Sequence, residues 1–82
     1  MPDSGRLNLK AYVNLDGKQY CVSTVGLTIE HYGGTWFETM VFASEDLKIT
    51  DYAERFCDRY KTEAEAQAGH AKTVLLLEDG KI

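Results

Sequence analysis

The sequence predicts an α+β domain, in which an antiparallel sheet of about four strands carries one C-terminal helix packed on one face. Three features predict this fold. Apolar and polar residues alternate in the first half, glycine-containing turns separate the alternating segments, and an alanine- and leucine-rich segment follows a helix-capping sequence. A chain of 82 residues forms one domain, so we expect residues 1–82 to fold together, with 1–5 disordered.

The first predicted element is a β-hairpin. Residues 7–13 alternate between apolar and polar side chains, and so do residues 18–25. Between them, Asp16-Gly17 is a typical two-residue type I′ turn. A turn of this length places Val13 opposite Tyr20 and so fixes the register of the two strands.

The next predicted elements are two further strands. Gly26 predicts a bulge or bend, after which a third strand covers residues 27–32. Gly33-Gly34 then predicts a second hairpin turn, and residues 35–43 form a strongly apolar strand after it.

The Gly33-Gly34 turn sets a register for this second hairpin. It places Leu27 opposite Met40 and Ile29 opposite Glu38. We expect the helix to cover the face to which these residues belong. Its apolar members are Leu27, Ile29, Trp36, Met40 and Phe42.

Residues 44–61 are ambiguous in sequence. The spacing of Tyr52, Phe56 and Tyr60 suits a helix, whereas alternation in residues 56–60 suits a strand. We favour the strand because Thr62, as a helix cap, requires an extended backbone just before it.

The C-terminal helix has clear start and stop signals. Thr62 and Glu65 form a Thr-x-x-Glu capping box, so the helix should begin at Glu63. Asp79-Gly80 is a stop signal, so it should end near Glu78. We expect its inward stripe to comprise Ala64, Ala68, Ala71, Val74 or Leu75, and Leu77 or Glu78, with Gly69 allowing a close approach to the sheet.

Composition and charge exclude some functions. The net charge is −4, and residues 45–65 carry most of the excess acid, which argues against direct binding of nucleic acid. No apolar run approaches the roughly 20 residues needed to span a bilayer. The N-terminal residues do not form a signal peptide, so we expect a cytoplasmic protein that does not associate with membranes.

Four side chains are of the types that bind metals, namely Cys21, His31, Cys57 and His70. Closed zinc sites draw their ligands in close pairs, and this spacing does not provide such pairs. We therefore expect no metal and no cofactor. The two cysteines should be reduced thiols, at least one of them packed as a small apolar side chain. His70 should lie on the helix surface or against the sheet.

The predicted register also brings Glu38 near His31, as diagonal neighbours on one face. A desolvated glutamate beside an imidazole could exchange protons, which makes a small enzyme one hypothesis. A buried polar contact that fixes the register, or a register error that puts Glu38 at the rim, is the better explanation of the pair, because neither a nucleophile nor an orienting group can be assigned. We therefore expect that the protein is not an enzyme.

Both faces of the strand at residues 35–43 are apolar, and one helix covers only one of them. On the second face Phe37 and Val41, flanked by Tyr12 and Tyr32, are candidates for an exposed partner-binding patch. The alternative is that residues 44–61 fold over these side chains.

Two segments resemble known sequences. They are the strand Glu38-Thr39-Met40-Val41-Phe42 and the helix start that runs from Tyr60 through Thr62, Glu65 and Ala66 to Gly69-His70. In residues 36–42 and 58–71 the chain resembles a group of short uncharacterised proteins of bacteriophages and prophages. The resemblance implies a phage origin and location in the host cytoplasm. It implies no activity and assigns no functional residue.

The leading hypothesis is a small, non-enzymatic phage-type accessory protein that acts by binding another protein or as a homodimer. One form is an inhibitor of a host defence protein, in which acidic side chains mimic phosphates in a nucleic-acid channel. Alternatives are a virion structural or assembly component and a small enzyme using Glu38 and His31. The acidic candidates are Glu45, Asp46, Asp51, Glu54 and Asp58.

Overall fold

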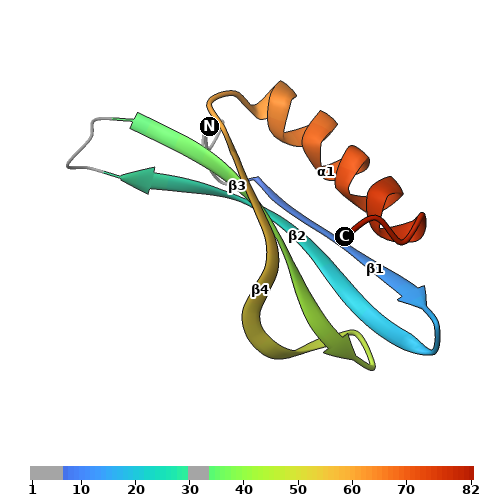
Figure 1. The fold of residues 1–82 in the computed structure, drawn as a ribbon. Helices are drawn as coiled ribbons and strands as arrows, with labels where there is room; N and C mark the ends of the chain where they lie inside the picture. The colour runs from blue at the N-terminus through green and yellow to red at the C-terminus, as the bar shows by residue number, and fades with distance from the viewer. Residues whose placement is uncertain (1–6, 30–33) are drawn as a thin grey trace.

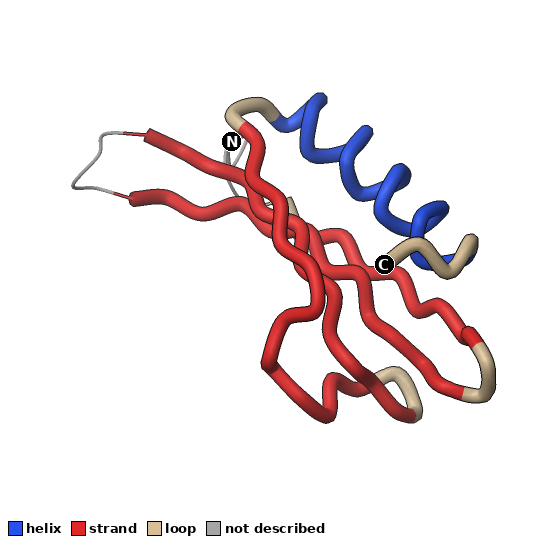
Figure 2. The backbone as a smooth tube through the Cα atoms, viewed as in Figure 1, coloured by secondary structure: helices blue, strands red, loops and turns tan. Residues whose placement is uncertain are grey.

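The computed structural model describes residues 7–29 and 34–82. It confirms the predicted α+β fold: four antiparallel strands form one sheet in sequential order, and the helix lies across one face (Figure 1). The tube view in Figure 2 shows the strong twist of the sheet beneath the helix. The elements are β1 (Asn8–Leu15), β2 (Lys18–Ile29), β3 (Gly34–Glu45), β4 (Lys48–Tyr60) and α1 (Glu63–Glu78).

The first hairpin forms as predicted. Asp16 and Gly17 both have positive φ angles, 52° and 76°, as a type I′ turn requires. Val13 lies opposite Tyr20, and the pairing continues to Asn8. The local turn sequence therefore sets this register.

Strand β2 continues through Gly26, so the predicted bend there is wrong. Gly26 lies opposite Phe37 of β3, and its backbone N–H donates a hydrogen bond of 2.9 Å to the carbonyl oxygen of Leu7. Neighbouring segments of the same chain on both sides thus hold this residue in the sheet, and the tertiary pairing overrides its weak strand propensity.

The predicted register of the second hairpin is also wrong. Leu27 lies opposite Trp36 rather than Met40, a displacement of four residues, and Glu38 lies opposite Val25 rather than Ile29. Ile29 pairs with Gly34, which therefore belongs to β3 and not to a turn. Because the displacement is even, each residue of β3 keeps the face that the alternation assigns to it.

The helix covers the opposite face from the one predicted. Phe37 and Val41 are 5% and 1% exposed, so the expectation of an exposed patch at these residues is wrong. Val41 belongs to the core under α1, with Ala11, Tyr20, Phe56 and Val74 packed against that core. Its buried members are Val13, Val22, Val41 and Leu77.

Strand β4 confirms the strand predicted at residues 56–60 and extends it back to Lys48. Its pairing with β3 is irregular, because Val41 lies opposite Phe56 while Ala43 lies opposite Asp51. The residues between Asp51 and Phe56 form a bulge at the sheet edge.

Helix α1 begins and ends where the sequence predicts. The Thr62 hydroxyl oxygen accepts a hydrogen bond of 3.1 Å from the backbone N–H of Glu65. At the other end, Gly80 has φ of 70°, and its N–H and that of Lys81 donate to carbonyls of the last turn, as in a Schellman motif.

The predicted inward stripe of the helix is wrong in its first half and right in its second half, where Val74 and Leu77 pack into the core. Ala64, Ala68 and Ala71 are exposed, and the side chains buried against the sheet are Ala66, Thr73 and Leu77. Alanine favours helix wherever it lies, so an alanine repeat does not identify the buried side. The prediction for Gly69 holds, since a Cβ there would overlap the ring of Tyr60.

Candidate binding surfaces

One face of the sheet has no cover from any element within residues 7–29 and 34–82. Even-numbered residues of β3 belong to it, because odd-numbered Val41 lies in the core beneath α1. In Figure 1 the helix lies on one side of the sheet only. We call this surface the uncovered face. Its half-buried apolar and aromatic residues are Tyr12, Val25, Trp36 and Met40.

Small side chains form the centre of the uncovered face. Cys21 is fully buried, although the helix lies on the other side, and its cross-strand neighbours are Tyr12 and Phe42. Phe42 is in turn shielded by Tyr52, whose ring centroid lies 5.4 Å away. Larger neighbours therefore close over the small residues, and the half-buried aromatic and apolar side chains share this face with exposed polar ones such as Asn8, Lys10 and Arg59.

Basic side chains flank the aromatic end of this face. The ammonium nitrogen of Lys61 lies 6.0 Å from the centroid of the Trp36 ring. Lys10 shares the face through its pairing with Ser23. Arg59 lies opposite Glu38 and donates a hydrogen bond of 2.7 Å from Nε to the Glu38 carboxylate.

The structure gives Glu38 a different partner from the one predicted. Glu38 is 7% exposed and paired with Arg59, and this contact raises the pKa of the guanidinium further. The register that placed Glu38 beside His31 is wrong, and His31 itself lies outside the described residues. Glu38 is therefore a satisfied ion-pair partner on the uncovered face.

The residues of the predicted apolar patch do not lie together in the structure. Phe37 and Val41 lie beneath the helix, whereas Tyr12 lies on the uncovered face with Cys21 and Phe42. Tyr32 lies outside the described residues. The structure thus keeps only Tyr12 as a candidate contact residue. Sequence reasoning took Trp36 and Met40 for core, because nothing in their alternation distinguishes one apolar face from the other.

The structure gathers the predicted acidic residues along one hairpin. All five are exposed: one ends β3, one lies in the turn after it, and three lie along β4, which also carries Lys48 and Arg55. Two of them have local backbone partners: the Asp51 and Asp58 carboxylates accept hydrogen bonds of 2.9 Å from Ala53 N–H and Arg59 N–H. These residues are Glu45, Asp46, Asp51, Glu54 and Asp58.

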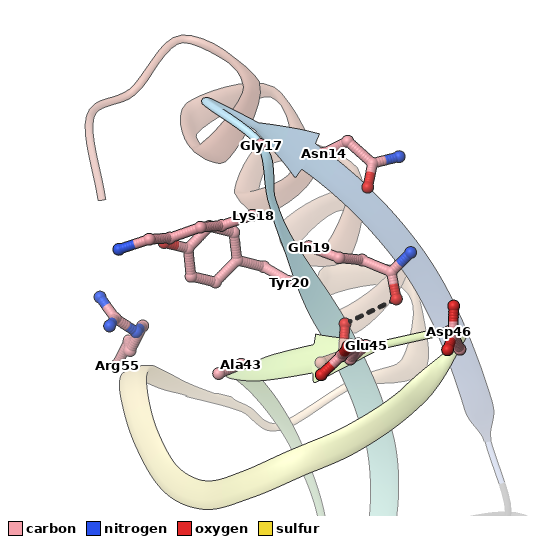
Figure 3. A pocket seen from close by; sticks show the side chains of 10 residues that line it. Asn14, Gly17, Lys18, Gln19, Tyr20, Ala43, Glu45, Asp46 and Arg55 are labelled. Atoms are coloured by element: carbon pink, nitrogen blue, oxygen red, sulfur yellow. Dashed lines mark hydrogen bonds between the residues drawn. The ribbon is translucent and has the colours of Figure 1, made fainter.

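A hollow of about 520 Å³ lies where the two hairpin turns meet (Figure 3). Lys18, Tyr20 and Arg55 lie together at one end, and the guanidinium carbon of Arg55 is 5.2 Å from the Tyr20 ring centroid. Glu45 and Asp46 lie at the other end. No sequence pattern indicated this hollow, because its walls come from all four strands and both hairpin turns.

Gln19 ties the two turns together beside this hollow. Its side-chain oxygen accepts a hydrogen bond of 3.1 Å from the Ser44 hydroxyl, the dashed line in Figure 3. It also accepts a hydrogen bond of 2.9 Å from the Leu47 N–H. Leu47 and Asp46 have φ angles of 63° and 51°, which lie in the left-handed region of the backbone. A bulky side chain such as that of leucine is disfavoured in this region. The Gln19 contact thus helps to hold a turn for which the local sequence is poorly suited.

A buried chain of polar groups joins the helix to the sheet. The Thr24 hydroxyl lies 2.6 Å from the Thr39 hydroxyl and 2.7 Å from Nδ1 of His70. Burial lowers the pKa of His70, which favours the neutral ring. His70 therefore contacts the sheet, one of the two positions predicted for it.

A hydroxyl beside an imidazole can act as an activated nucleophile. Thr24, however, is 0% exposed, so no substrate can reach its oxygen in this arrangement. A second internal bond, from the Thr73 hydroxyl to the carbonyl of Gly69 at 2.7 Å, satisfies the remaining polar group on the buried side of the helix. The Thr24–His70 contact therefore orients α1 on the sheet, whereas the Thr73 bond lies within the helix.

Both cysteines are free thiols. Cys21 is buried, which raises its pKa, and it packs as a small apolar side chain as predicted. Cys57 is exposed, but it is still partly desolvated. This desolvation, followed by the nearby charges of Glu38 and Glu54, raises the pKa of its thiol as well. Within the described residues, no group of three His, Cys, Asp or Glu side chains could hold a metal ion.

Comparison with protein-family models, with curated proteins and with solved structures gave no match. In the part of the chain that the structure describes, no helix has the length and apolar character needed to cross a bilayer. The functional argument therefore depends on the surfaces themselves.

Proposed function

We propose that this chain is a small, non-enzymatic accessory protein of phage type that acts by binding another protein through the uncovered face. The observation that supports this most directly is the position of Trp36 and Met40, half-buried side chains on a sheet face that no described element covers. Aromatic residues and methionine are enriched at the centres of protein interfaces.

The charges on this face suggest the chemistry of the partner. Lys10 and Lys61 flank the apolar centre, and Arg59 is largely exposed although it contacts Glu38. A protein surface with an apolar centre and an acidic rim would complement this arrangement.

Inhibition of a host defence protein through the acidic hairpin is the second candidate. It is favoured by the exposure of all five predicted acidic residues, from the end of β3 through the turn and along β4. A partner held there would be basic, and its binding would weaken steeply with added salt. Binding through the uncovered face would change less with salt, because apolar contacts carry it.

A pair of variants tests the leading proposal. Met40→Asp places a charge at the centre of the uncovered face, whereas Leu75→Asp places the same charge on the outer side of α1, where Leu75 is 62% exposed. Affinity capture from host cytoplasm, with each variant and the unchanged chain as bait, measures the effect. We expect Met40→Asp to lose the specifically captured protein and Leu75→Asp to keep it.

Circular dichroism of both variants confirms that they are folded. Capture that is equal for the two baits would contradict binding through the uncovered face. Capture that survives Met40→Asp but disappears at high salt would instead favour the acidic hairpin.

A further inference from the structure

The two edges of the sheet differ in how they are protected against further pairing. Strand β4 carries six charged residues among thirteen and contains a bulge, both of which hinder the approach of another strand. Strand β1 has eight residues and Lys10 as its only charge, with neither a proline nor a bulge. Among the described elements, β1 is therefore the edge open to pairing.

The hydrogen-bond pattern identifies which backbone groups of β1 point outward. The Gly26 N–H donates to the Leu7 carbonyl, so Leu7 and Gly26 form a hydrogen-bonded pair. Such pairs alternate along an antiparallel ladder, which makes Leu9, Ala11, Val13 and Leu15 the residues bonded to β2. The N–H and C=O groups that point away from the sheet belong to the alternate residues, Asn8, Lys10, Tyr12 and Asn14.

We propose that β1 pairs in antiparallel fashion with β1 of a second copy of this chain, which joins two four-stranded sheets into one sheet of eight strands. The two-fold axis passes beside Ala11, the residue about which the outward-facing groups are symmetric. This surface uses the backbone edge of β1, whereas the proposed partner binding centres on Trp36 and Met40. The side chains of Lys10 and Tyr12 border both surfaces, so Met40→Asp tests the partner-binding face without touching the β1 edge.

Full overlap of the outward groups defines the register. Asn8 of one copy then lies opposite Asn14 of the other, and Lys10 lies opposite Tyr12. No like charges oppose each other, and a lysine stem beside a tyrosine ring is a favourable cross-strand neighbour. A shift that aligned Lys10 with its own copy would place two ammonium groups together.

The same register continues the core across the axis. On the helix-covered face, half-buried Leu9 lies opposite buried Val13 of the second copy, and Ala11 lies opposite itself. Val13 belongs to the core beneath α1, and Ala11 packs against it. Two thin cores thus merge into one, which adds apolar burial that a short domain lacks.

Proline substitutions on neighbouring residues provide the test. Lys10→Pro removes an outward N–H and leaves the bonds to β2 intact, which an edge strand tolerates. In the matched control, Ala11→Pro removes an N–H bonded to β2 and should destabilise each chain. Sedimentation of the full chain up to about 1 mM detects even a dimer with a dissociation constant near that value.

We expect the unchanged chain to sediment as a dimer, with twice the mass of one 9.2 kDa chain. Lys10→Pro should raise the dissociation constant of the dimer about 25-fold. Each lost hydrogen bond is worth roughly a factor of five, and the two-fold symmetry means that two such bonds are lost. A monomer for the unchanged chain at about 1 mM, or a dimer unaffected by Lys10→Pro, would overturn the proposal.

Charge substitutions test the register without altering the backbone. Asn8→Lys together with Asn14→Lys places like charges opposite each other and should weaken the dimer, more so at low salt. Asn8→Glu together with Asn14→Lys places opposite charges there and should restore or strengthen it. Equal dissociation constants for the two double variants would exclude this register.

Amide hydrogen exchange gives an independent measurement. Because the N–H groups of Lys10 and Tyr12 have no partner in the β1–β2 ladder, they should be protected only in the dimer, and their protection should rise with concentration. A dimer in which both amides exchange freely would show that another surface joins the two copies, and the proposal would fall.

Discussion

The two faces of the sheet differ in a direction that hydropathy does not predict. The helix-covered face buries a Thr24, Thr39 and His70 network, whereas the uncovered face carries Trp36 and Met40. The number of apolar residues favoured the uncovered face as the core. The difference shows that polar side chains can be buried when they hydrogen-bond to one another. The number of apolar residues on a face therefore does not by itself identify the buried face.

In the structure, two side chains of β4 mark the covered face. Phe56 and Tyr60 alternate with Cys57 and Arg59, and the apolar pair lies on the side of the helix. Gly69 then meets the Tyr60 ring directly. A chain that leaves β4 and turns back as α1 therefore covers the face on which Tyr60 and Phe56 lie.

The largest expected difference between the faces comes from adjacent residues. Val41→Asp buries a carboxylate beneath α1 and should cost more than about 4 kcal/mol, enough to unfold a domain of this size. Met40→Asp, on the uncovered face, should leave the chain folded. Circular dichroism and urea unfolding of the two variants measure this; equal losses would show that both faces are covered.

Thr24→Val tests the polar network within the covered face. The change keeps the shape of the side chain but leaves Thr39 and His70 without their shared hydroxyl, which should cost about 2 kcal/mol in the free energy of unfolding. Thr50→Val at an exposed position is the control and should cost far less. A neutral Thr24→Val variant would mean that the network contributes nothing to stability.

Gly69→Ala tests how closely the helix approaches β4. The added Cβ would overlap the Tyr60 ring, so we expect a net loss of about 1 kcal/mol despite the higher helix propensity of alanine. In a Tyr60→Ala background the same change should stabilise the chain by about 1 kcal/mol. Chemical unfolding of all four chains completes the cycle, and additive effects would rule out the clash.

The smallest effect is expected from pH. Burial lowers the pKa of His70 in the folded chain, so the unfolded chain binds a proton first as pH falls below its ordinary value of about 6.5. Stability should be complete above that pH and decline from there towards the lower folded pKa. Urea unfolding between about pH 7.5 and 5.5 measures it, and His70→Gln should remove this part of the slope. An unchanged slope in that variant would assign the pH dependence to other groups.

The sequence by itself determined the elements that have local causes. Thr62 and Gly80 fix the ends of α1 through hydrogen bonds within a few residues, and Asp16-Gly17 fixes the first hairpin because glycine readily adopts a positive φ. The approach to Thr62 also indicated correctly that residues 56–60 form a strand.

Only the tertiary structure decided the register of β2 on β3, the covered face and the turn at Asp46 and Leu47. Trp36 and Phe37 are equally apolar and point to opposite sides, so a period of two cannot choose between them. Leu47 accepts its positive φ with help from a distant partner, Gln19. Each of these outcomes depends on contacts between residues far apart in the chain, and no local pattern records such contacts.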